Sequence, residues 1–361
     1  MSELTHVTIV GPLPPPAGGM ANQTRKLAEF LREEGIDVNI IQVNPAYFPA
    51  FVEKIPVVRA GFRLLQYFVS LFKELKKAQV VHIMANSGWS WHLFAAPAIW
   101  VARLMGKPVV LNYRGGYAKD FFDKSWFWVK PSLSRCQQIL VPSAFLEEVF
   151  SEFGHRAEVV PNVLDQLKFY PKDKVFETQA PHIIVTRNLE LIYDVETAIK
   201  GFAIVQKSYP NAILSVAGTG PELSALQTLV KQLNLETNVT FVGRLSPEEI
   251  ANLYRNADVM INTSIVDNSP NSIIESLACG TPVVSTNVGG IPKLVSDQVD
   301  AILVEPKQAD AIGAGVLKLI QDSSFRDSLV EEGAKTVSKF YWPNVWQRLK
   351  LSYCNAMRYQ G

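Results

Sequence analysis

The chain has 361 residues, of which 48% are hydrophobic and 19% are charged, and its formal net charge is +1. Single hydrophobic cores seldom grow beyond about 250–300 residues, so this length predicts two domains. A net charge near zero argues against a polyanion such as DNA as the partner, and no nucleic acid is expected.

The ends of the chain and its cysteines favour a cytoplasmic protein. The N-terminus, Met-Ser-Glu-Leu-Thr-His, lacks the form of a signal peptide. No uncharged apolar run reaches the roughly 18 residues needed to span a bilayer. Cys136, Cys279 and Cys354 lie far apart without metal-ligand spacing, which fits a reducing compartment.

Short β-rich runs alternate with helical stretches along the chain. Most runs are continuously apolar, as expected for parallel strands whose sheet is covered by helices on both faces. The pattern predicts two doubly wound α/β domains, with a seam at Asn162–Pro181 and a final helix from Trp342 to Arg358. The predicted strands are His6–Val10, Val38–Val43, Val80–Met84, Val109–Tyr113, Gln138–Pro142, Glu158–Val160, His182–Thr186, Ala212–Ala217, Val239–Val242, Val259–Asn262, Val283–Ser285 and Ala301–Val304.

A glycine-containing loop follows the first predicted strand. Gly18 and Gly19 stand just before a helical stretch from about Ala21 to Glu34. Glycines at the mouth of a parallel strand let backbone amides approach a phosphate, and the next helix N-terminus favours an anion. The G-x-G-x-x-G spacing of a dinucleotide site is absent, and a plain turn is an equally good interpretation.

Two stretches of the first half have a composition suited to a membrane surface. Residues 61–77 place apolar side chains at helical spacing and end in basic residues, and residues 121–130 combine aromatic residues with lysine. Such segments can rest on an anionic bilayer, so peripheral contact with the inner face of the membrane is one expectation. Packing of both segments on the sheet is the other expectation, and it is the favoured one.

Arginines follow two predicted strands at their carboxyl ends. Arg114 follows one strand of the first half, and Arg187 follows the first strand of the second half, with Tyr193 six residues later. An arginine can bind phosphate but cannot act as a general base near neutral pH. His82 lies within a strand and is predicted to be a buried core residue.

Two loops of the second half can contact a ligand or serve as packing turns. Gly218 closes one strand, and Arg244 follows the next. After Arg244, Ser246 and Glu249 have the spacing of a capping box and predict the start of a helix.

Asp267 and Glu275 form the most informative pair. Asp267 falls in a polar loop after a strand-like run, and Glu275 falls about one turn into a helix that begins near Pro270. This spacing can place a carboxylate at each end of a phosphate-bearing ligand, with free backbone amides between them.

The stretch from Asp267 to Glu275 resembles the acid-x7-acid motif of the family 4 glycosyltransferases, which have the GT-B fold. The glycine loop, Arg187 and the Asn287–Pro292 stretch resemble further motifs of this family, in the same order. Asp267 stands where the family usually has glutamate. Tyr193 stands where it has a lysine, and Arg114 where it has a histidine.

The resemblance implies two Rossmann-like domains that face a central cleft. We expect an acceptor-binding domain at 1–165, a donor domain at 175–340, and a C-terminal helix at 341–361 that crosses back to the first domain. The implied reaction is retaining transfer of a hexosyl unit from a nucleotide-diphosphate sugar to a hydroxyl of a glycan, a lipid-linked sugar or a small molecule. Such an enzyme would act in polysaccharide or glycolipid biosynthesis.

The resemblance also implies roles for individual residues. Glu275 is expected to bind the nucleotide ribose, Asp267 to lie near the transferred sugar, and Arg187 to bind the diphosphate. Arg114 joins Asp267 and Arg187 as a catalytic candidate. No metal and no cofactor are expected, because fixed positive charge and helix N-termini can stabilise the leaving diphosphate. The residues expected to bind the donor are Gly18, Gly19, Arg187, Tyr193, Gly218, Arg244, Asn271, Ser272, Ile273 and Glu275.

Two other functions remain as alternatives, and a third is excluded. A non-catalytic protein that binds sugar nucleotides or glycans is favoured by the missing lysine and histidine, and it is opposed by the retained Asp267, Glu275 and Arg187. A sugar-nucleotide epimerase of related architecture would turn over donor without an acceptor. A nicotinamide-dependent oxidoreductase is excluded by the incomplete glycine fingerprint.

Overall fold

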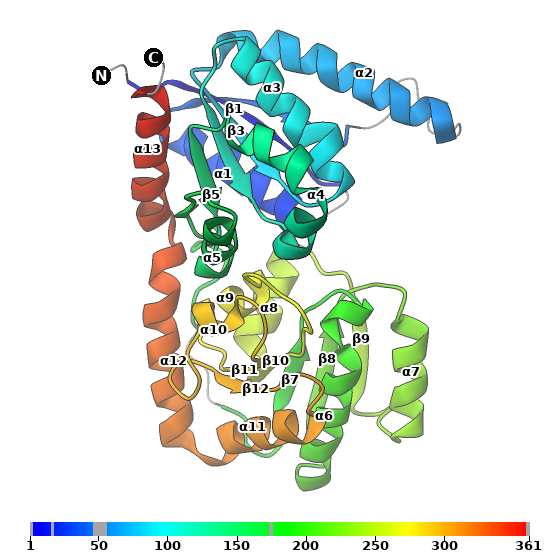
Figure 1. Cartoon of the computed structure of the whole chain (residues 1–361). Helices are drawn as coiled ribbons and strands as arrows, with labels where there is room; N and C mark the ends of the chain where they lie inside the picture. Colours follow the sequence, from blue (N-terminus) through cyan, green and yellow to red (C-terminus); the bar gives the residue numbers. More distant parts are fainter. Residues whose placement is uncertain (1–2, 16–17, 46–55, 173–175, 359–361) are drawn as a thin grey trace. The chain divides into compact units, whose positions relative to one another are not determined.

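The computed structural model describes residues 3–15, 18–45, 56–172 and 176–358 (Figure 1). The chain divides into two compact units, one made of Met1–Val163 and Trp342–Gly361, the other of Leu164–Tyr341. Residue 175, where the second domain is expected to begin, lies outside the described residues. Each unit is an α/β structure with its own sheet and core.

The first unit contains a parallel sheet in the order β2-β1-β3-β4-β5-β6. Its strands are β1 His6–Gly11, β2 Asp37–Gln42, β3 Val80–Ala85, β4 Val109–Tyr113, β5 Gln138–Val141 and β6 Glu158–Val159. Its helices and helical turns are α1 Gly19–Glu33, α2 Pro56–Glu74, η2 Leu75–Lys77, η3 Trp91–Ala95, α3 Ala96–Leu104, α4 Ala118–Leu133, α5 Ala144–Glu152 and α13 Trp342–Arg358.

Both faces of this sheet are buried, which explains its continuously apolar strands. One face packs against α2, α3, α4 and α5 through a core that includes Tyr67, Ile99 and Phe122. The other face packs against α1 and the C-terminal helix α13, through side chains such as Leu31 and Tyr353. The last helix therefore belongs structurally to the first unit, although the whole second unit precedes it in sequence.

The second unit repeats the architecture with strand order β12-β11-β10-β7-β8-β9, again parallel throughout. The strands are β7 His182–Val185, β8 Ile213–Ala217, β9 Val239–Gly243, β10 Val259–Asn262, β11 Val283–Thr286 and β12 Ile302–Val304. The helices and helical turns are η4 Leu191–Tyr193, α6 Val195–Ser208, α7 Leu223–Gln232, α8 Pro247–Asn256, α9 Asn271–Ala278, α10 Ile291–Leu294, α11 Ala309–Gln321, α12 Ser323–Val337 and η5 Ser338–Phe340.

All twelve predicted strands are present, and their ends differ from the prediction by no more than a residue or so. The predicted helix from Trp342 to Arg358 and the capping box at Ser246 and Glu249 are also confirmed. The predicted start of a helix near Pro270 is correct, since α9 begins at Asn271 with Pro270 as its N-cap.

Candidate functional site

The strand order of the second unit places its candidate residues at one point of the sheet. From β7 the chain winds outward through β8 and β9, then returns to β10 on the other side of β7. Ligands of doubly wound sheets bind at such a switch point, beyond the carboxyl ends of the two strands. Arg187 follows β7, and Asp267 lies in the loop after β10.

Arg187 and Asp267 contact each other directly. The guanidinium Nη2 of Arg187 forms an ion pair with the carboxylate of Asp267, and both side chains are nearly buried, at 12% and 13% exposure. Nη1 of Arg187 donates to the hydroxyl of Ser272, 3.3 Å away, in the first turn of α9. Ser264 donates to the Asp267 carboxylate over 3.4 Å. The predicted arginine, the first acid and the start of α9 therefore form one cluster.

Tyr193 contacts Arg187 through its aromatic ring. It does not supply the positive charge of the lysine that family 4 usually has at this position. The guanidinium carbon lies 4.1 Å from the centre of the Tyr193 ring, a cation–π contact. The backbone carbonyl of Tyr193 also accepts a hydrogen bond from Thr263, just after β10. Arg187 is thus fixed between an aromatic face and a carboxylate.

This contact predicts how Tyr193 variants behave. Tyr193→Phe keeps the ring face and should change the donor affinity by less than about twofold, whereas Tyr193→Ala should weaken it by about tenfold, since a partly buried cation–π contact is lost. Titration with the donor substrate measures both. Equal affinities for the two variants would contradict a positioning role for the ring.

Glu275 lies on α9, one turn beyond Ser272. Its carboxylate and the Arg187 guanidinium both act on the buried phenol of Tyr254 in α8. Burial is the main cause that raises the pKa of Tyr254 well above its usual 10, the Glu275 charge raises it further, and Arg187 opposes the shift. The Tyr254 hydroxyl lies 2.7 Å from that of Thr186, which directly precedes Arg187. Glu275 and Arg187 are therefore close to the same phenol.

Glycines support the backbone on both sides of this cluster. A Cβ on Gly290 would lie 1.8 Å from the backbone oxygen of Asn268, and the Gly290 amide donates to the carbonyl of Asp267 over 2.9 Å. On the other side, a Cβ on Gly218 would lie 2.0 Å from the Arg187 carbonyl oxygen. Gly218 therefore packs closely on the Arg187 backbone, which fits the packing turn that is one of the two interpretations of this loop.

The remaining donor candidates of the second unit differ in their placement. Asn271 and Ser272 open α9, but the side chain of Ile273 is in the core and its amide donates to the Pro270 carbonyl. Arg244 is exposed in the loop between β9 and α8. Direct contacts join Arg187 with Asp267, Ser272 and Tyr193, and Glu275 lies one turn beyond Ser272 on α9.

The candidate residues of the first unit also lie at the carboxyl edge of its sheet. Gly18 is the N-cap of α1, after β1, and a Cβ on Gly18 or Gly19 would meet nothing within 4 Å. Arg114 follows β4, where its guanidinium contacts Asn162. Burial lowers the pKa of Arg114 to about 10, so the side chain still carries a positive charge at neutral pH.

His82 is a core residue, as predicted. Its ring nitrogens lie 2.9 Å from the Tyr353 hydroxyl of α13 and 3.2 Å from the Asn112 amide of β4. Burial, and next the charge of Arg114, lower the pKa of His82 from 6.5 to about 3. His82 is thus neutral in the folded protein and ties the C-terminal helix to the sheet.

The low pKa of His82 gives a pH dependence of stability. The unfolded chain binds a proton at His82 below about pH 6.5 and the folded chain does not, so this stabilisation is complete above 6.5 and is lost as the pH falls toward 3. His82→Gln should remove about 1.4 kcal/mol per pH unit from the decline in unfolding free energy below pH 6.5. Urea unfolding of wild type and His82→Gln between pH 7 and pH 4 measures this. If the unfolding free energies of the two proteins decline in parallel, the prediction is wrong.

Among the residues that the structure describes, no group of three or more His, Cys, Asp or Glu side chains could hold a metal ion. No helix in the same ranges is both long enough and apolar enough to cross a bilayer.

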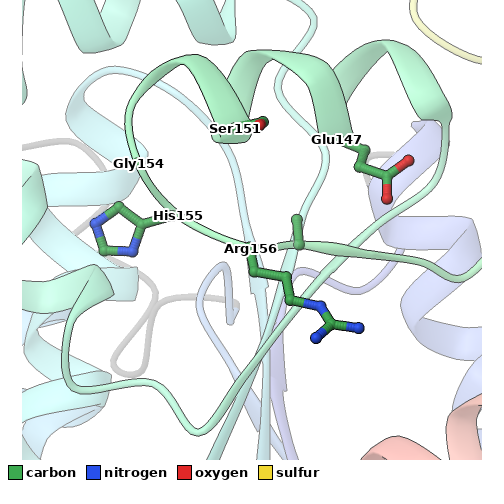
Figure 2. A pocket seen from close by; sticks show the side chains of 6 residues that line it. Glu147, Ser151, Gly154, His155 and Arg156 are labelled. Atoms are coloured by element: carbon green, nitrogen blue, oxygen red, sulfur yellow. The ribbon is translucent and has the colours of Figure 1, made fainter.

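A pocket of about 270 Å³ lies elsewhere, at the end of α5 (Figure 2). Glu147, Ser151, His155 and Arg156 line it, and the segment between α5 and β6 forms its wall. Because this segment leads into the start of a parallel strand, the pocket lies at the opposite edge of the sheet from Arg114. It is not part of the candidate site.

Two family models match the chain side by side. A model described as glycosyltransferase family 4 matches residues 17–166, and one described as glycosyl transferases group 1 matches residues 168–336. The chain belongs to glycosyltransferase family 4.

Curated relatives and solved structures agree with this family and with the GT-B fold. The glycosyltransferase is 27% identical to the uncharacterized glycosyltransferase MJ1607 of Methanocaldococcus jannaschii, over 95% of this chain and 96% of the relative. It is 23% identical to the alpha-monoglucosyldiacylglycerol synthase of Streptococcus pneumoniae, over 95% and 84%. Its fold matches sucrose-phosphate synthase of Thermosynechococcus elongatus with a TM-score of 0.77 at 18% identity, over 98% and 99% of the two chains.

Sequence reasoning missed three parts of the site. Tyr254 was not considered, because a tyrosine in an amphipathic helix gives no signal of its own. Ser264 gives no signal either, because serine is common in polar loops and its hydrogen bond to Asp267 depends on how the loop folds. The close approach of Gly290 to the Asp267 loop joins two segments that are distant in sequence, so the local pattern does not predict it.

Proposed function

We propose that this glycosyltransferase transfers a hexosyl unit from a nucleotide-diphosphate sugar to a hydroxyl acceptor with retention of configuration. The observation that carries the proposal is the cluster of Arg187, Asp267 and Ser272 at the switch point of the second sheet, with Glu275 one turn further along α9. A cation, a helix start and two carboxylates are the groups that a diphosphate sugar requires.

In this proposal the second unit binds the donor. Glu275 accepts hydrogen bonds from the ribose hydroxyls, and Asp267 from hydroxyls of the transferred sugar. Arg187 and the first turn of α9 bind the diphosphate. Nε of Arg187 is buried and has no hydrogen-bond partner among the described residues, so the guanidinium keeps a donor for a phosphate oxygen.

The leaving diphosphate needs positive charge more than it needs a base. The bond from the anomeric carbon to the phosphate oxygen breaks while a bond to the acceptor oxygen forms, and the acceptor proton passes to the departing phosphate oxygen. Arg187 and the N-terminus of α9 stabilise the charge that develops, without a metal ion or cofactor. Since no general base is needed, an arginine at position 114 is compatible with this reaction.

The first unit is proposed to bind the acceptor. Arg114 supplies a fixed positive charge that suits a phosphate or an acidic acceptor. In the same unit, Gly18 and Gly19, which we expect to bind the donor, leave room for a phosphate near the start of α1. Beside Arg114, the hydroxyls of Ser87 and Tyr113 lie 2.7 Å apart, after β3 and in β4. Tyr113 is buried, and the partly exposed Ser87 hydroxyl that it holds can bind an acceptor hydroxyl or a sugar.

The names of relatives suggest which substrates to test first. One structural neighbour, Anabaena HepE, was solved in complex with UDP and glucose, and it matches 98% of this chain with a TM-score of 0.72 at 15% identity. UDP-glucose and other UDP-hexoses are therefore the first donors to test. Lipid-linked sugars, glycans and small molecules all remain acceptor classes, and contact with the inner face of the membrane would suit the first of them.

A non-catalytic protein that binds sugar nucleotides is the second candidate. It is favoured by Tyr193 and Arg114, which replace the lysine and histidine typical of the family. An epimerase is a weaker alternative, because it would release product from donor alone.

Product analysis by NMR separates the three functions. Wild type with donor and a panel of acceptors should give an α-linked product from an α-linked donor, and Glu275→Ala should lose at least about tenfold in kcat/KM because two ribose contacts are lost. Donor binding without turnover would establish the binding protein. A changed sugar without acceptor would establish the epimerase.

A further inference from the structure

The helical layer on one face of the first sheet carries apolar side chains on its outer surface. The inner sides of α2, α3 and α4 all pack on that face of the sheet, while α1 and α13 cover the other face (Figure 1). Of sixteen large apolar side chains that are exposed in the described residues, nine lie between residues 61 and 135. This segment is about a fifth of the chain, so the concentration is local.

Helix α2 is apolar on both sides. Tyr67 and Leu71 face the core, whereas Leu65, Val69 and Phe72 are 62%, 60% and 50% exposed. The three exposed residues follow each other at spacings of four and three, so they form one stripe along the helix. A helix that covers a sheet normally places polar residues on that side.

The next two helices also carry exposed apolar side chains. On α3, Leu104 is 80% exposed, and the partly exposed Trp100 donates to Ser132 of α4. On α4, Phe127 and Trp128 are 78% and 70% exposed, and their rings contact each other at 5.1 Å. We name the stripe of α2 together with Leu104, Phe127 and Trp128 the outer apolar surface.

The charge of the same segment is strongly positive. Residues 61–135 hold eleven Lys and Arg but only three Asp and Glu, a net charge of +8, although the whole chain has +1. Several of these cations are exposed and stand close in sequence to residues of the outer apolar surface. They include Lys73, Lys76 and Lys77 after the stripe, Arg103 beside Leu104, and Lys124 and Lys130 on either side of the two aromatics.

We propose that the outer apolar surface binds an anionic lipid bilayer, with α2 lying along the membrane plane. Exposed Trp and Phe insert at the level of the lipid headgroups, and lysines around them meet the negative surface potential. This combination of a broad apolar face and a positive rim fits a bilayer better than a single small ligand. The proposal does not depend on the glycosyl transfer, because it rests on another part of the fold.

Co-sedimentation of the full chain with vesicles tests the proposal without any activity measurement. The vesicles contain phosphatidylcholine alone or with 30% phosphatidylglycerol, each at low and at physiological salt. The patch variants are Leu65→Ser/Phe72→Ser on α2 and Phe127→Ser/Trp128→Ser on α4. The control variants replace exposed apolar residues elsewhere, Leu351→Ser on α13 and Val299→Ser in the second unit, which are 55% and 49% exposed.

Wild type and both controls should bind the anionic vesicles, more weakly at the higher salt, and should bind neutral vesicles far less. Each patch variant should bind at least about tenfold more weakly, since two large apolar side chains are lost from the interface. No binding of wild type to anionic vesicles at low salt would overturn the proposal. Patch variants that bind the anionic vesicles as well as wild type would also overturn it. If the patch variants change only the oligomeric state measured by light scattering, the surface binds a second copy of the chain and the proposal is wrong.

Discussion

Replacing Arg187 with alanine should lower kcat/KM by about 10²–10³-fold, the loss typical of a preorganised donor to developing charge. The side chain contacts Asp267, Ser272 and the ring of Tyr193, so it is fixed before the ligand arrives. Arg187→Lys keeps the charge but loses the planar guanidinium, so its kcat/KM should lie between those of wild type and Arg187→Ala. Steady-state kinetics with the identified donor measures all three proteins.

Arg255→Ala is the matched control for this experiment. Arg255 is also an arginine of the second unit that stacks on a tyrosine, Tyr170, and binds a backbone carbonyl. It should leave kcat/KM within about threefold of wild type, since it touches none of the proposed donor groups. Because Arg187→Ala leaves the nearly buried Asp267 without its cation, thermal unfolding of each variant must show that it is folded. Equal losses in folded Arg187→Ala and Arg255→Ala would contradict the role of Arg187.

Replacing Gly290 with alanine should also reduce kcat/KM strongly, by about 10²-fold, although Gly290 contacts no substrate in our proposal. The added Cβ would lie 1.8 Å from the Asn268 carbonyl oxygen and 2.8 Å from its carbon, so the backbone must move. The loop that moves carries Asp267 and, through it, Arg187. A shift of about 1 Å in such a group is enough for this loss.

Gly61→Ala is the control, because a Cβ on Gly61 in helix α2 meets nothing within 4 Å. It should leave activity unchanged and not lower stability, since alanine is favoured over glycine in a helix. Gly290→Ala should also lower the unfolding free energy by about 1–3 kcal/mol, as expected for overpacking. Activity of Gly290→Ala close to that of wild type would show that the Asp267 loop need not stay where the structure places it.

The sequence predicts the fold well because its signal is local. Each buried parallel strand is a continuous apolar run, and the helices between the strands follow from periodicity, so all twelve strands could be found from the chain alone. The helix starts at Ser246 and Pro270 depend on short motifs, so the sequence predicts them as well as it predicts the strands. The order of strands in each sheet needs the structure, because contacts between distant segments decide it.

The site could be predicted only in part. Arg187, Asp267 and Glu275 stand out because they match the motifs of the family 4 glycosyltransferases in the same order along the chain. The contact of Tyr193 with Arg187 could not be predicted, because the sequence does not distinguish a tyrosine that stacks on a guanidinium from one that packs in a core. Gly218 and Gly290 contact backbone atoms from distant segments, and no local pattern gives such an approach.

The most direct test of a donor site at Arg187 and Glu275 is a thermal-shift measurement with UDP-, GDP-, ADP- and dTDP-sugars. A ligand that binds only the folded state raises the Tm by mass action, whatever the acceptor is. We predict that sugars of one nucleotide raise the Tm of wild type and Arg255→Ala, and do so much less for Arg187→Ala and Glu275→Ala. If no nucleotide sugar shifts the wild-type Tm, or if both site variants respond as wild type does, the donor is not bound at this cluster.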